Sequence, residues 1–124
     1  VFLYECTHEP LILNGWIFSL WGLYYYSKYI DDDNVKNTLT TTLNTLKKKL
    51  PEFDIGYWSK YDIEKRICSS FYHKLHIAQL KVMYDLFGDE IYKKYADTWN
   101  KYQKNFLKRN RAFCKKMIQK IFEK

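Results

Sequence analysis

The sequence predicts an all-α protein built from antiparallel helical hairpins. Glycine and proline are scarce, with 4 Gly and 2 Pro in 124 residues, which disfavours a fold with many tight turns. Apolar residues recur at helical spacing through most of the chain, and short breaks separate the helical segments. Strands do not alternate with helices, so a doubly wound sheet is not expected. The lack of a clean repeat leaves open whether the hairpins stack as a solenoid or close into a ring.

The first half of the chain is predicted to form one helical hairpin. Residues 11–30 are apolar on every face of a helix, which is typical of a helix buried on most sides. The acidic run at residues 31–34 ends that helix and provides an N-cap for a second helix over residues 34–50, which Pro51 prevents from continuing. Three lysines in the last turn of the second helix suit its dipole. Its predicted core stripe consists of Val35, Leu39, Leu43, Leu46 and Leu50.

The second half repeats this arrangement after an irregular stretch. Residues 51–68 have no helical period, and their aromatic, glycine and alternating polar positions predict a short hairpin or an ordered loop. Residues 69–87 and 89–107 are predicted helices joined by a Gly88-Asp89 turn, and a last helix is expected over residues 110–123. The predicted core residues are Leu75, Leu80, Met83, Tyr84 and Phe87, then Ile91, Tyr95, Trp99, Tyr102 and Phe106, then Phe113, Met117 and Ile121.

The length is sufficient for one domain with its own core, so we expect residues 1–124 to form a single helical domain. The chain begins at Val1 without a charged leader and cleavage site, so we expect it to be a piece of a longer polypeptide. Three widely separated cysteines predict neither a zinc site nor a disulfide framework, and they favour a reducing compartment. The content of Lys, Asn, Ile and Tyr indicates AT-rich codon usage, from which we expect a bacterial source.

The net charge of +7 belongs to the end of the chain. Residues 1–100 carry 12 Lys or Arg against 13 Asp or Glu, whereas residues 101–124 carry 9 against 1. The basic composition of the whole chain is therefore no argument for nucleic-acid binding. We expect a solvated helix face at this end, with an anionic polymer, a membrane surface or nucleic acid as the alternatives.

Residues 10–27 are free of charge over 18 positions, which is near the lower limit for a membrane-spanning helix. Asn14, Gly15, Ser19, Gly22 and a tyrosine triplet interrupt the stretch. We therefore predict a buried helix rather than a membrane span, and with no signal peptide in the sequence a cytoplasmic location is favoured.

Nucleotide-binding, zinc-protease and nucleophile-elbow motifs are absent from the sequence, so the chemistry is sought in the helix over residues 69–87. His73 and His76 lie one helical turn apart and could chelate a metal, but the segment offers no further ligand, so we expect no metal site. Tyr72, His76 and Gln79 share one face of this helix. Such a face is either a set of side chains that reach the surface or the lining of a polar cavity.

Three segments of the sequence together resemble one known family. They are LNGWIFSLWGLYYY (residues 13–26), LPEFDIGYWSKYDI (50–63) and YHKLHIAQL (72–80). Their patterns and their order are similar to those of the C-terminal domain of D-glucuronyl C5-epimerases, enzymes of heparin and heparan sulfate biosynthesis with bacterial relatives. The likeness covers about residues 1–103, and the third segment is the most specific.

The resemblance implies a fold and an activity. The fold would be an incomplete (α/α) toroid of helical hairpins, with this chain as its C-terminal part. The activity would be inversion of carbon 5 of D-glucuronate residues in a polysaccharide, without a cofactor. The proton removed is α to a carboxylate, so two acid/base groups on opposite faces of the sugar ring are expected. Cationic neighbours could make a tyrosine a usable base.

The resemblance also implies the site residues. Tyr72 and Tyr61 are the expected catalytic acid and base, with Tyr4 in support. Contacts with the carboxylates or hydroxyls of the sugar are expected from His73, His76 and Gln79. Asn14 matches the first segment and is expected either to face the cleft or to cap a backbone turn, and Arg66 is a further candidate for substrate binding.

One departure from the family pattern lies beside the second tyrosine. The family motif YDLRH reads YDIEK here, so Glu64 stands where an arginine could clamp a carboxylate. Lys60, Lys65 or Arg66 would have to compensate. Asp54, in the same segment, is expected to hold its loop through local backbone hydrogen bonds.

Three other functions stay open. The domain could bind a glycan without turnover, or act as a uronate polysaccharide lyase, which shares the proton abstraction. A nucleic-acid scaffold would depend only on residues 108–124. We expect an anionic glycan as the partner and no nucleic acid, and a homodimer is compatible with the sequence.

Overall fold

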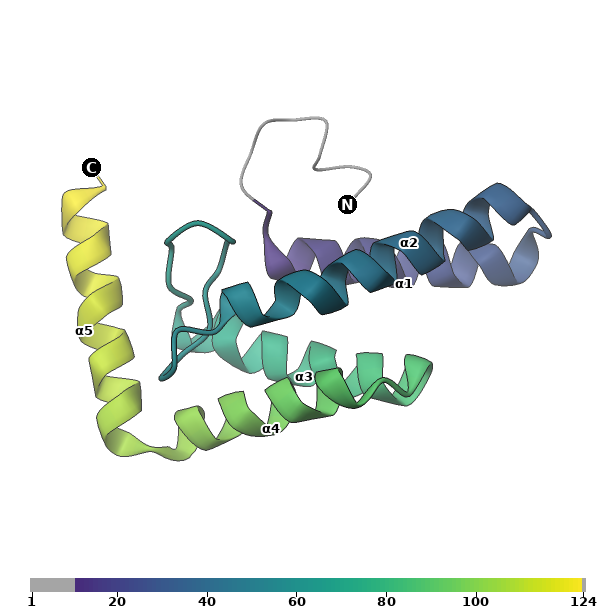
Figure 1. The fold of residues 1–124 in the computed structure, drawn as a ribbon. Helices are drawn as coiled ribbons and strands as arrows, with labels where there is room; N and C mark the ends of the chain where they lie inside the picture. Colours follow the sequence, from purple (N-terminus) through teal and green to yellow (C-terminus); the bar gives the residue numbers. More distant parts are fainter. Residues whose placement is uncertain (1–10, 124) are drawn as a thin grey trace.

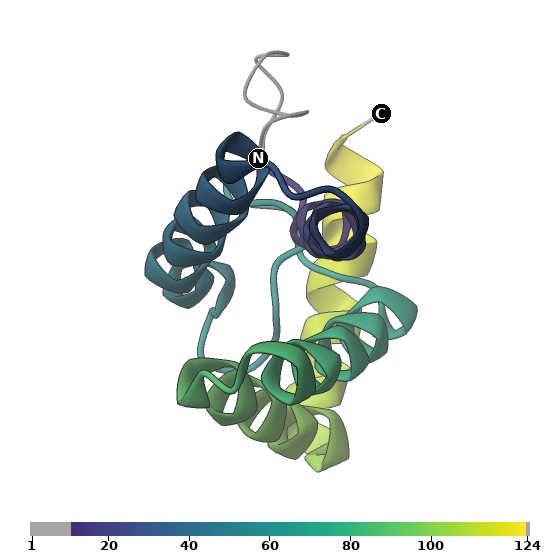
Figure 2. The ribbon, with the colours of Figure 1, turned by 90° about the vertical axis from the view of Figure 1, so that its right-hand side faces the viewer.

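The computed structural model describes residues 11–123, and this part of the chain is all-α, as predicted. It contains five α-helices and one short 3₁₀ helix, and the β-structure of these residues is limited to three isolated bridges. The first four helices form two antiparallel hairpins that lie one against the other, and the last helix runs across one end of them (Figures 1 and 2).

The first hairpin joins α1 (Leu13–Tyr29) to α2 (Asp33–Lys49). The Asp32 carboxylate accepts a hydrogen bond from the Asn34 amide at 2.8 Å, which caps α2 as the acidic run predicted. Three lysines occupy the last turn of α2. The 3₁₀ helix η1 (Leu50–Phe53) follows with a proline in its first turn, so the α-helix ends there.

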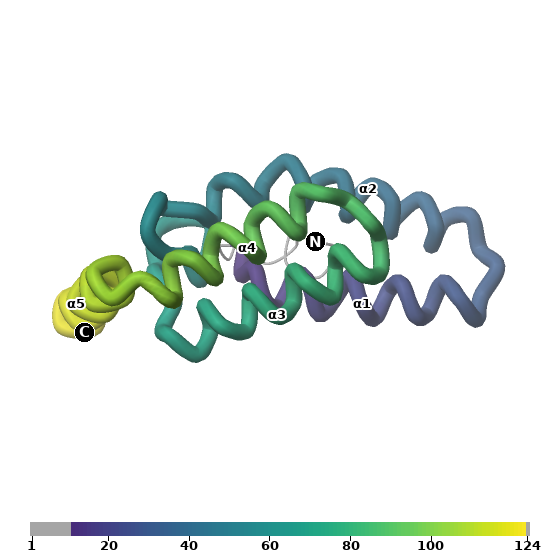
Figure 3. The backbone as a smooth tube through the Cα atoms, turned by 90° about the horizontal axis from the view of Figure 1, so that it is seen from below, coloured from purple at the N-terminus to yellow at the C-terminus, as the bar shows by residue number. Residues whose placement is uncertain are grey.

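The second hairpin joins α3 (Ser70–Phe87) to α4 (Glu90–Lys104). Gly88 ends α3 with a φ of +75°, in the left-handed region that favours glycine, and its amide donates to the Tyr84 carbonyl at 2.8 Å. These two helices pack against each other more extensively than any other pair of elements in the described chain (Figure 3).

The main apolar core lies between the two hairpins, and every element around it contributes. Trp16 comes from α1, Leu46 from α2, Phe53 from η1, Leu80 from α3 and Trp99 from α4, and all five are buried. Burying each of these side chains stabilises the fold by about 1.5–3 kcal/mol relative to leaving it in water.

The prediction that α1 is buried on most sides was wrong for the described chain. Phe18, Tyr25, Tyr26 and Tyr29 are exposed, because α2 and α3 cover only one side of α1.

A membrane span is not found among residues 11–123, because none of their helices combines the length and the apolar character that crossing a membrane requires.

The irregular stretch predicted for residues 51–68 begins inside η1, and residues 54–69 form an ordered loop. Two isolated antiparallel bridges, Asp54–Ser59 and Lys60–Ile67, fold the loop back on itself. The Asp54 carboxylate accepts a hydrogen bond from the amide two residues later at 2.8 Å, so this residue holds its loop as expected. Residues 54–69 are called the loop.

The boundary between the last two helices differs from the prediction. α4 ends at Lys104 and α5 (Phe106–Phe122) begins two residues later. The Asn105 side chain accepts a hydrogen bond from the Lys108 amide at 3.0 Å and caps α5, which stops α4 short of residue 107.

The predicted core stripe of the last helix was also wrong. Phe113, Met117 and Ile121 are exposed, and Ala112 is the buried residue among those described in α5. The reason is that α5 turns its polar side, with Lys116 and Gln119, toward the loop.

Candidate functional site

Two of the predicted catalytic tyrosines lie in contact with each other. Tyr61 belongs to the loop and Tyr72 to the first turn of α3, and their ring centroids are 5.0 Å apart with the ring planes at 71°. Both side chains are partly buried. The Arg66 guanidinium carbon lies 5.3 Å from the centre of the Tyr61 ring, as a cation over an aromatic ring. The third predicted tyrosine, Tyr4, lies outside the described residues.

Local hydrogen bonds explain why the two tyrosines meet. The Ser69 hydroxyl accepts from the Tyr72 amide at 3.3 Å and caps α3, which sets where its first turn begins. The Tyr61 carbonyl accepts from the Leu13 amide at 3.2 Å, and the Tyr61 amide donates to the Arg66 carbonyl at 2.6 Å. The loop is therefore tied to the start of α1 at the residue that contacts α3.

Asp62 organises the turn that carries Arg66. Its Oδ1 accepts from the amides of Glu64, Lys65 and Arg66 at 3.1, 3.0 and 3.1 Å, and its Oδ2 pairs with the Arg66 guanidinium. Burial alone would raise the pKa of Asp62, but the hydrogen bonds from Arg66 and Lys65 outweigh burial and lower it. Asp62 is not among the predicted site residues, although an aspartate at the start of a polar turn is a recognisable signal in a sequence.

His73 is buried, and both of its ring nitrogens are hydrogen-bonded. The Ser59 amide donates to Nδ1 at 3.2 Å, and Nε2 lies 2.9 Å from the Trp99 carbonyl oxygen. Because an amide only donates and a carbonyl only accepts, the ring is neutral and carries its proton on Nε2. The Trp58 ring stacks on the imidazole at 3.7 Å. Burial lowers the pKa of His73 to about 4, although the hydrogen bond to the Trp99 carbonyl raises it in part.

The Ser59 hydroxyl links this histidine to His76. Its oxygen lies 2.8 Å from His73 Nδ1 and 3.2 Å from His76 Nδ1, and the Cys68 sulfur lies 3.5 Å from the same His76 nitrogen. Burial, and next the neighbouring His73, lower the pKa of His76 to about 3. Burial raises the pKa of the Cys68 thiol to about 12. The two imidazoles and the thiol are therefore uncharged near neutral pH.

Four buried side-chain polar atoms on α1 and α3 have no hydrogen-bond partner among residues 11–123. They are Asn14 Oδ1, Trp16 Nε1, His76 Nε2 and Gln79 Oε1. The other end of the Gln79 amide donates to the Asn14 carbonyl at 3.1 Å and joins the two helices. Buried polar atoms without partners are uncommon and costly, so each of them requires an explanation.

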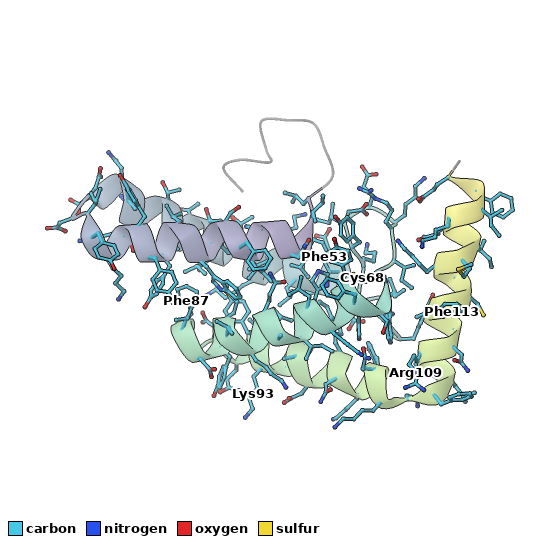
Figure 4. The ribbon with its side chains drawn as sticks, turned by 180° about the vertical axis from the view of Figure 1, so that it is seen from behind. Phe53, Cys68, Phe87, Lys93, Arg109 and Phe113 are labelled. Carbon is cyan, nitrogen blue, oxygen red and sulfur yellow. The ribbon has the colours of Figure 1, made fainter. Side chains whose placement is uncertain are left out.

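The structure thus sorts the predicted site residues into two groups. The outer group consists of Tyr61, Tyr72 and Arg66, which are partly exposed. The inner group consists of His73 and His76 with Ser59 and Cys68, all buried between the loop, α3 and α4; Figure 4 labels Cys68 beside the start of α3. Ser59 carries no signal in the sequence, because its role depends on contacts with residues 14 and 17 positions away.

Within residues 11–123, neither a metal-ligand cluster nor the surface depression on α4 extends the site. In residues 11–123 no set of three or more His, Cys, Asp or Glu side chains is arranged to hold a metal ion. A surface depression on α4 includes neither group, and its lining residues are Glu90, Ile91, Lys93, Lys94 and Asp97.

The fold and the outer group together define an all-helical domain with a pair of tyrosines at its loop. The sequence model of the family described as the D-glucuronyl C5-epimerase C-terminus matches residues 2–101, most of the chain. The chain belongs to this family, as its three sequence segments indicated. The match ends before α5 begins.

Two relatives illustrate the range of the similarity. An uncharacterised protein of the archaeon Methanocaldococcus jannaschii is 31% identical over 96 residues, which cover 77% of this chain and 31% of that protein. The D-glucuronyl C5-epimerase of Caenorhabditis elegans is 28% identical, over 77% of this chain and 19% of that protein. The chain thus spans about a third or less of the length of the curated relatives it matches.

Proposed function

We propose that this chain is part of an enzyme that inverts carbon 5 of D-glucuronate residues in a polysaccharide. Membership of the epimerase family supports the reaction class, and the contact between Tyr61 and Tyr72 is the observation that carries the mechanism. The two helical hairpins would form part of an (α/α) toroid in the complete enzyme.

In the proposed reaction one tyrosine removes the C5 proton and the other returns a proton to the opposite face. The C5–H bond breaks, the electron pair passes into the adjacent carboxylate as an enolate-like state, and a new C5–H bond forms with inverted configuration. No net oxidation occurs. Tyr61 and Tyr72 are the candidates for these two roles, with Tyr4 in support of either step.

The remaining predicted residues take different parts in this proposal. Asn14, His76 and Gln79 each keep a buried polar atom without a protein partner in the described chain, so we assign them to contacts with the substrate. His73 uses both ring nitrogens within the protein and acts as a positioning residue that holds the loop against α3. Arg66 is paired with Asp62, so its guanidinium would contact the sugar carboxylate while it stays bonded to Asp62.

The experiment that tests this proposal is deuterium incorporation at carbon 5. The full-length protein is incubated in heavy water with a glucuronate-containing polysaccharide of the heparan sulfate backbone, and incorporation is followed by NMR. Tyr72→Phe is expected to abolish incorporation while the free energy of unfolding changes by less than about 1 kcal/mol, since only one partly exposed hydroxyl is lost. Retained exchange would remove Tyr72 from the mechanism.

A matched control comes from the same helix. The Tyr84 hydroxyl is bonded to Glu90 at 3.1 Å, away from the tyrosine pair, so Tyr84→Phe is expected to leave exchange unchanged. If both variants lose activity together, the effect is structural and the assignment of Tyr72 fails.

Glu64 supports a second candidate function, a glycan-binding domain without turnover. Its exposed carboxylate stands where the family motif has an arginine, and it would repel an acidic sugar at the reacting position. Glycan binding without deuterium incorporation is the outcome that would favour this alternative. Absorbance from an unsaturated product would instead identify a lyase.

A further inference from the structure

Helix α5 is attached to the protein by its polar side, the reverse of an ordinary amphipathic helix. Gln119 accepts from the Ile67 amide at 3.0 Å and donates to the Lys65 carbonyl at 2.8 Å. Lys116 donates to the Ile67 carbonyl at 2.9 Å. These bonds satisfy the backbone of the loop, so they fix which side of α5 faces the protein.

The opposite side of α5 is apolar and lies in water. Its exposed side chains are Phe106, Leu107, Phe113, Met117, Ile118, Ile121 and Phe122. The exposed fraction reaches 66% for Phe113 and 82% for Phe122. At 3.6 residues per turn these positions cover about half of the circumference of the helix. The same spacing places Asn110 and Arg111 among them, so this surface is mainly apolar. A large exposed apolar surface marks an interaction site.

Five of the six charges of α5 lie outside this apolar side, and the sixth, Arg111, lies within it, with its guanidinium carbon 4.0 Å from the centre of the Tyr57 ring. The helix carries six Lys or Arg residues and no Asp or Glu. Helical spacing places Arg109 and Lys120 along one edge of the apolar side and Lys115 along the other. Lys115 and Lys120 form no ion pair with the residues that the structure describes. Figure 4 labels Arg109 and Phe113 on this helix.

We propose that α5 lies on the surface of an anionic lipid membrane, with its apolar side inserted among the lipid chains. This inference is independent of the proposed epimerase activity, and α5 lies beyond the part of the chain that matches the family. An apolar side flanked by lysine and arginine is the composition of a helix that rests in a membrane interface. The long cationic side chains at its edges would extend to lipid phosphates.

Other kinds of binding partner would match either the apolar side chains or the cations of this surface, but not both. A single partner helix packs on a stripe of about 100°, narrower than the apolar side of α5. A second copy of α5 would bring two sets of six cations together without an acidic residue from either helix to offset them. A nucleic acid or an acidic glycan would neutralise the cations but leave the apolar side chains in water.

The test is sedimentation of the full chain with vesicles. Phosphatidylcholine vesicles that contain phosphatidylglycerol are expected to bind the protein, pure phosphatidylcholine vesicles are expected to bind it more weakly, and added salt is expected to reduce binding to the anionic vesicles. The double substitution Phe113→Ser and Ile121→Ser is expected to weaken partitioning by at least about tenfold. Lys115→Ala with Lys120→Ala is expected to weaken binding to the anionic vesicles only.

A matched control uses exposed aromatic residues on another helix. Tyr25 and Tyr29 of α1 are 56% and 87% exposed, and changing both to Ser is expected to alter partitioning by less than about twofold. Circular dichroism checks that each variant stays helical. Absence of binding to anionic vesicles, or equal binding by all variants, overturns the proposal. A dimer that only the Phe113 and Ile121 substitutions dissociate, without vesicle binding, would assign the surface to a second copy instead.

Discussion

The loop is held on two sides by helices that use different kinds of side chain. On the side of α3, His73 bonds the loop through a neutral imidazole that is buried beneath Trp58. On the side of α5, Lys116 and Gln119 bond it through groups nearer to the surface. A hydrogen bond lost inside the protein leaves groups that water cannot reach, whereas one lost at the surface is replaced by water. The α3 side therefore determines the geometry of the tyrosine pair.

Acid is expected to disrupt the α3 side most strongly. The pKa values of His73 and His76 are lowered to about 4 and about 3, so the unfolded chain binds protons more readily than the folded one. The stability from their neutral state is complete above the ordinary histidine pKa of about 6.5, and it is lost as the pH falls toward 4 and then 3. At pH 4 the loss from His73 alone is about 3 kcal/mol.

Urea unfolding at pH 7.5, 5.5 and 4.5 measures this loss, and the wild-type chain is compared with His73→Leu. The variant is expected to show a shallower decline over this range, since one of the two titrating groups is absent. Cys68 does not add to the slope, because its pKa is raised to about 12 and the thiol stays protonated. Equal slopes for both proteins would contradict the assignment.

The substitution His73→Leu also tests the α3 side directly at neutral pH. It removes the partners of the Ser59 amide and the Trp99 carbonyl, both of which are buried, so the free energy of unfolding is expected to fall by about 3 kcal/mol. The matched control is Lys74→Leu, the same change at the exposed neighbouring position, with an expected effect within about 0.5 kcal/mol. Equal losses of unfolding free energy in the two variants would mean that the buried hydrogen bonds of His73 do not stabilise the protein.

On the α5 side the expected effect is smaller. Gln119→Ala removes two hydrogen bonds to the loop, at 3.0 and 2.8 Å, but water can replace them at this partly exposed position. We expect a loss of about 1 kcal/mol and no change in deuterium exchange at carbon 5. A loss as large as that of His73→Leu would show that both sides of the loop are equally important.

Much of the fold could be predicted from local patterns. The Asp32 cap, the Gly88 turn and the proline after α2 all act within a few residues, so their effect is readable from the sequence. The break before α5 was misplaced because Asn105 caps the helix without any glycine or proline to mark it. The core stripe of α5 was misassigned because periodicity reveals an apolar face but not the direction in which that face points.

The candidate site divides in the same way. Tyr61 and Tyr72 could be named from the family segments, and so could the two histidines. Tyr61 contacts Tyr72, whereas both histidines are buried against Trp58 and Trp99. Spacing along one helix could not predict this difference, because the loop supplies Tyr61, Trp58 and Ser59.

The sequence by itself determined the all-α class, the helix ends that carry local caps and the family, and it supplied the tyrosines as candidates. Each of these depends on neighbouring residues or on segments that can be compared one at a time. Only the tertiary structure decided that the histidines are neutral and buried, and that α5 turns its apolar side outward. These properties arise from contacts between residues distant in the chain or from the packing around them, which no local pattern encodes.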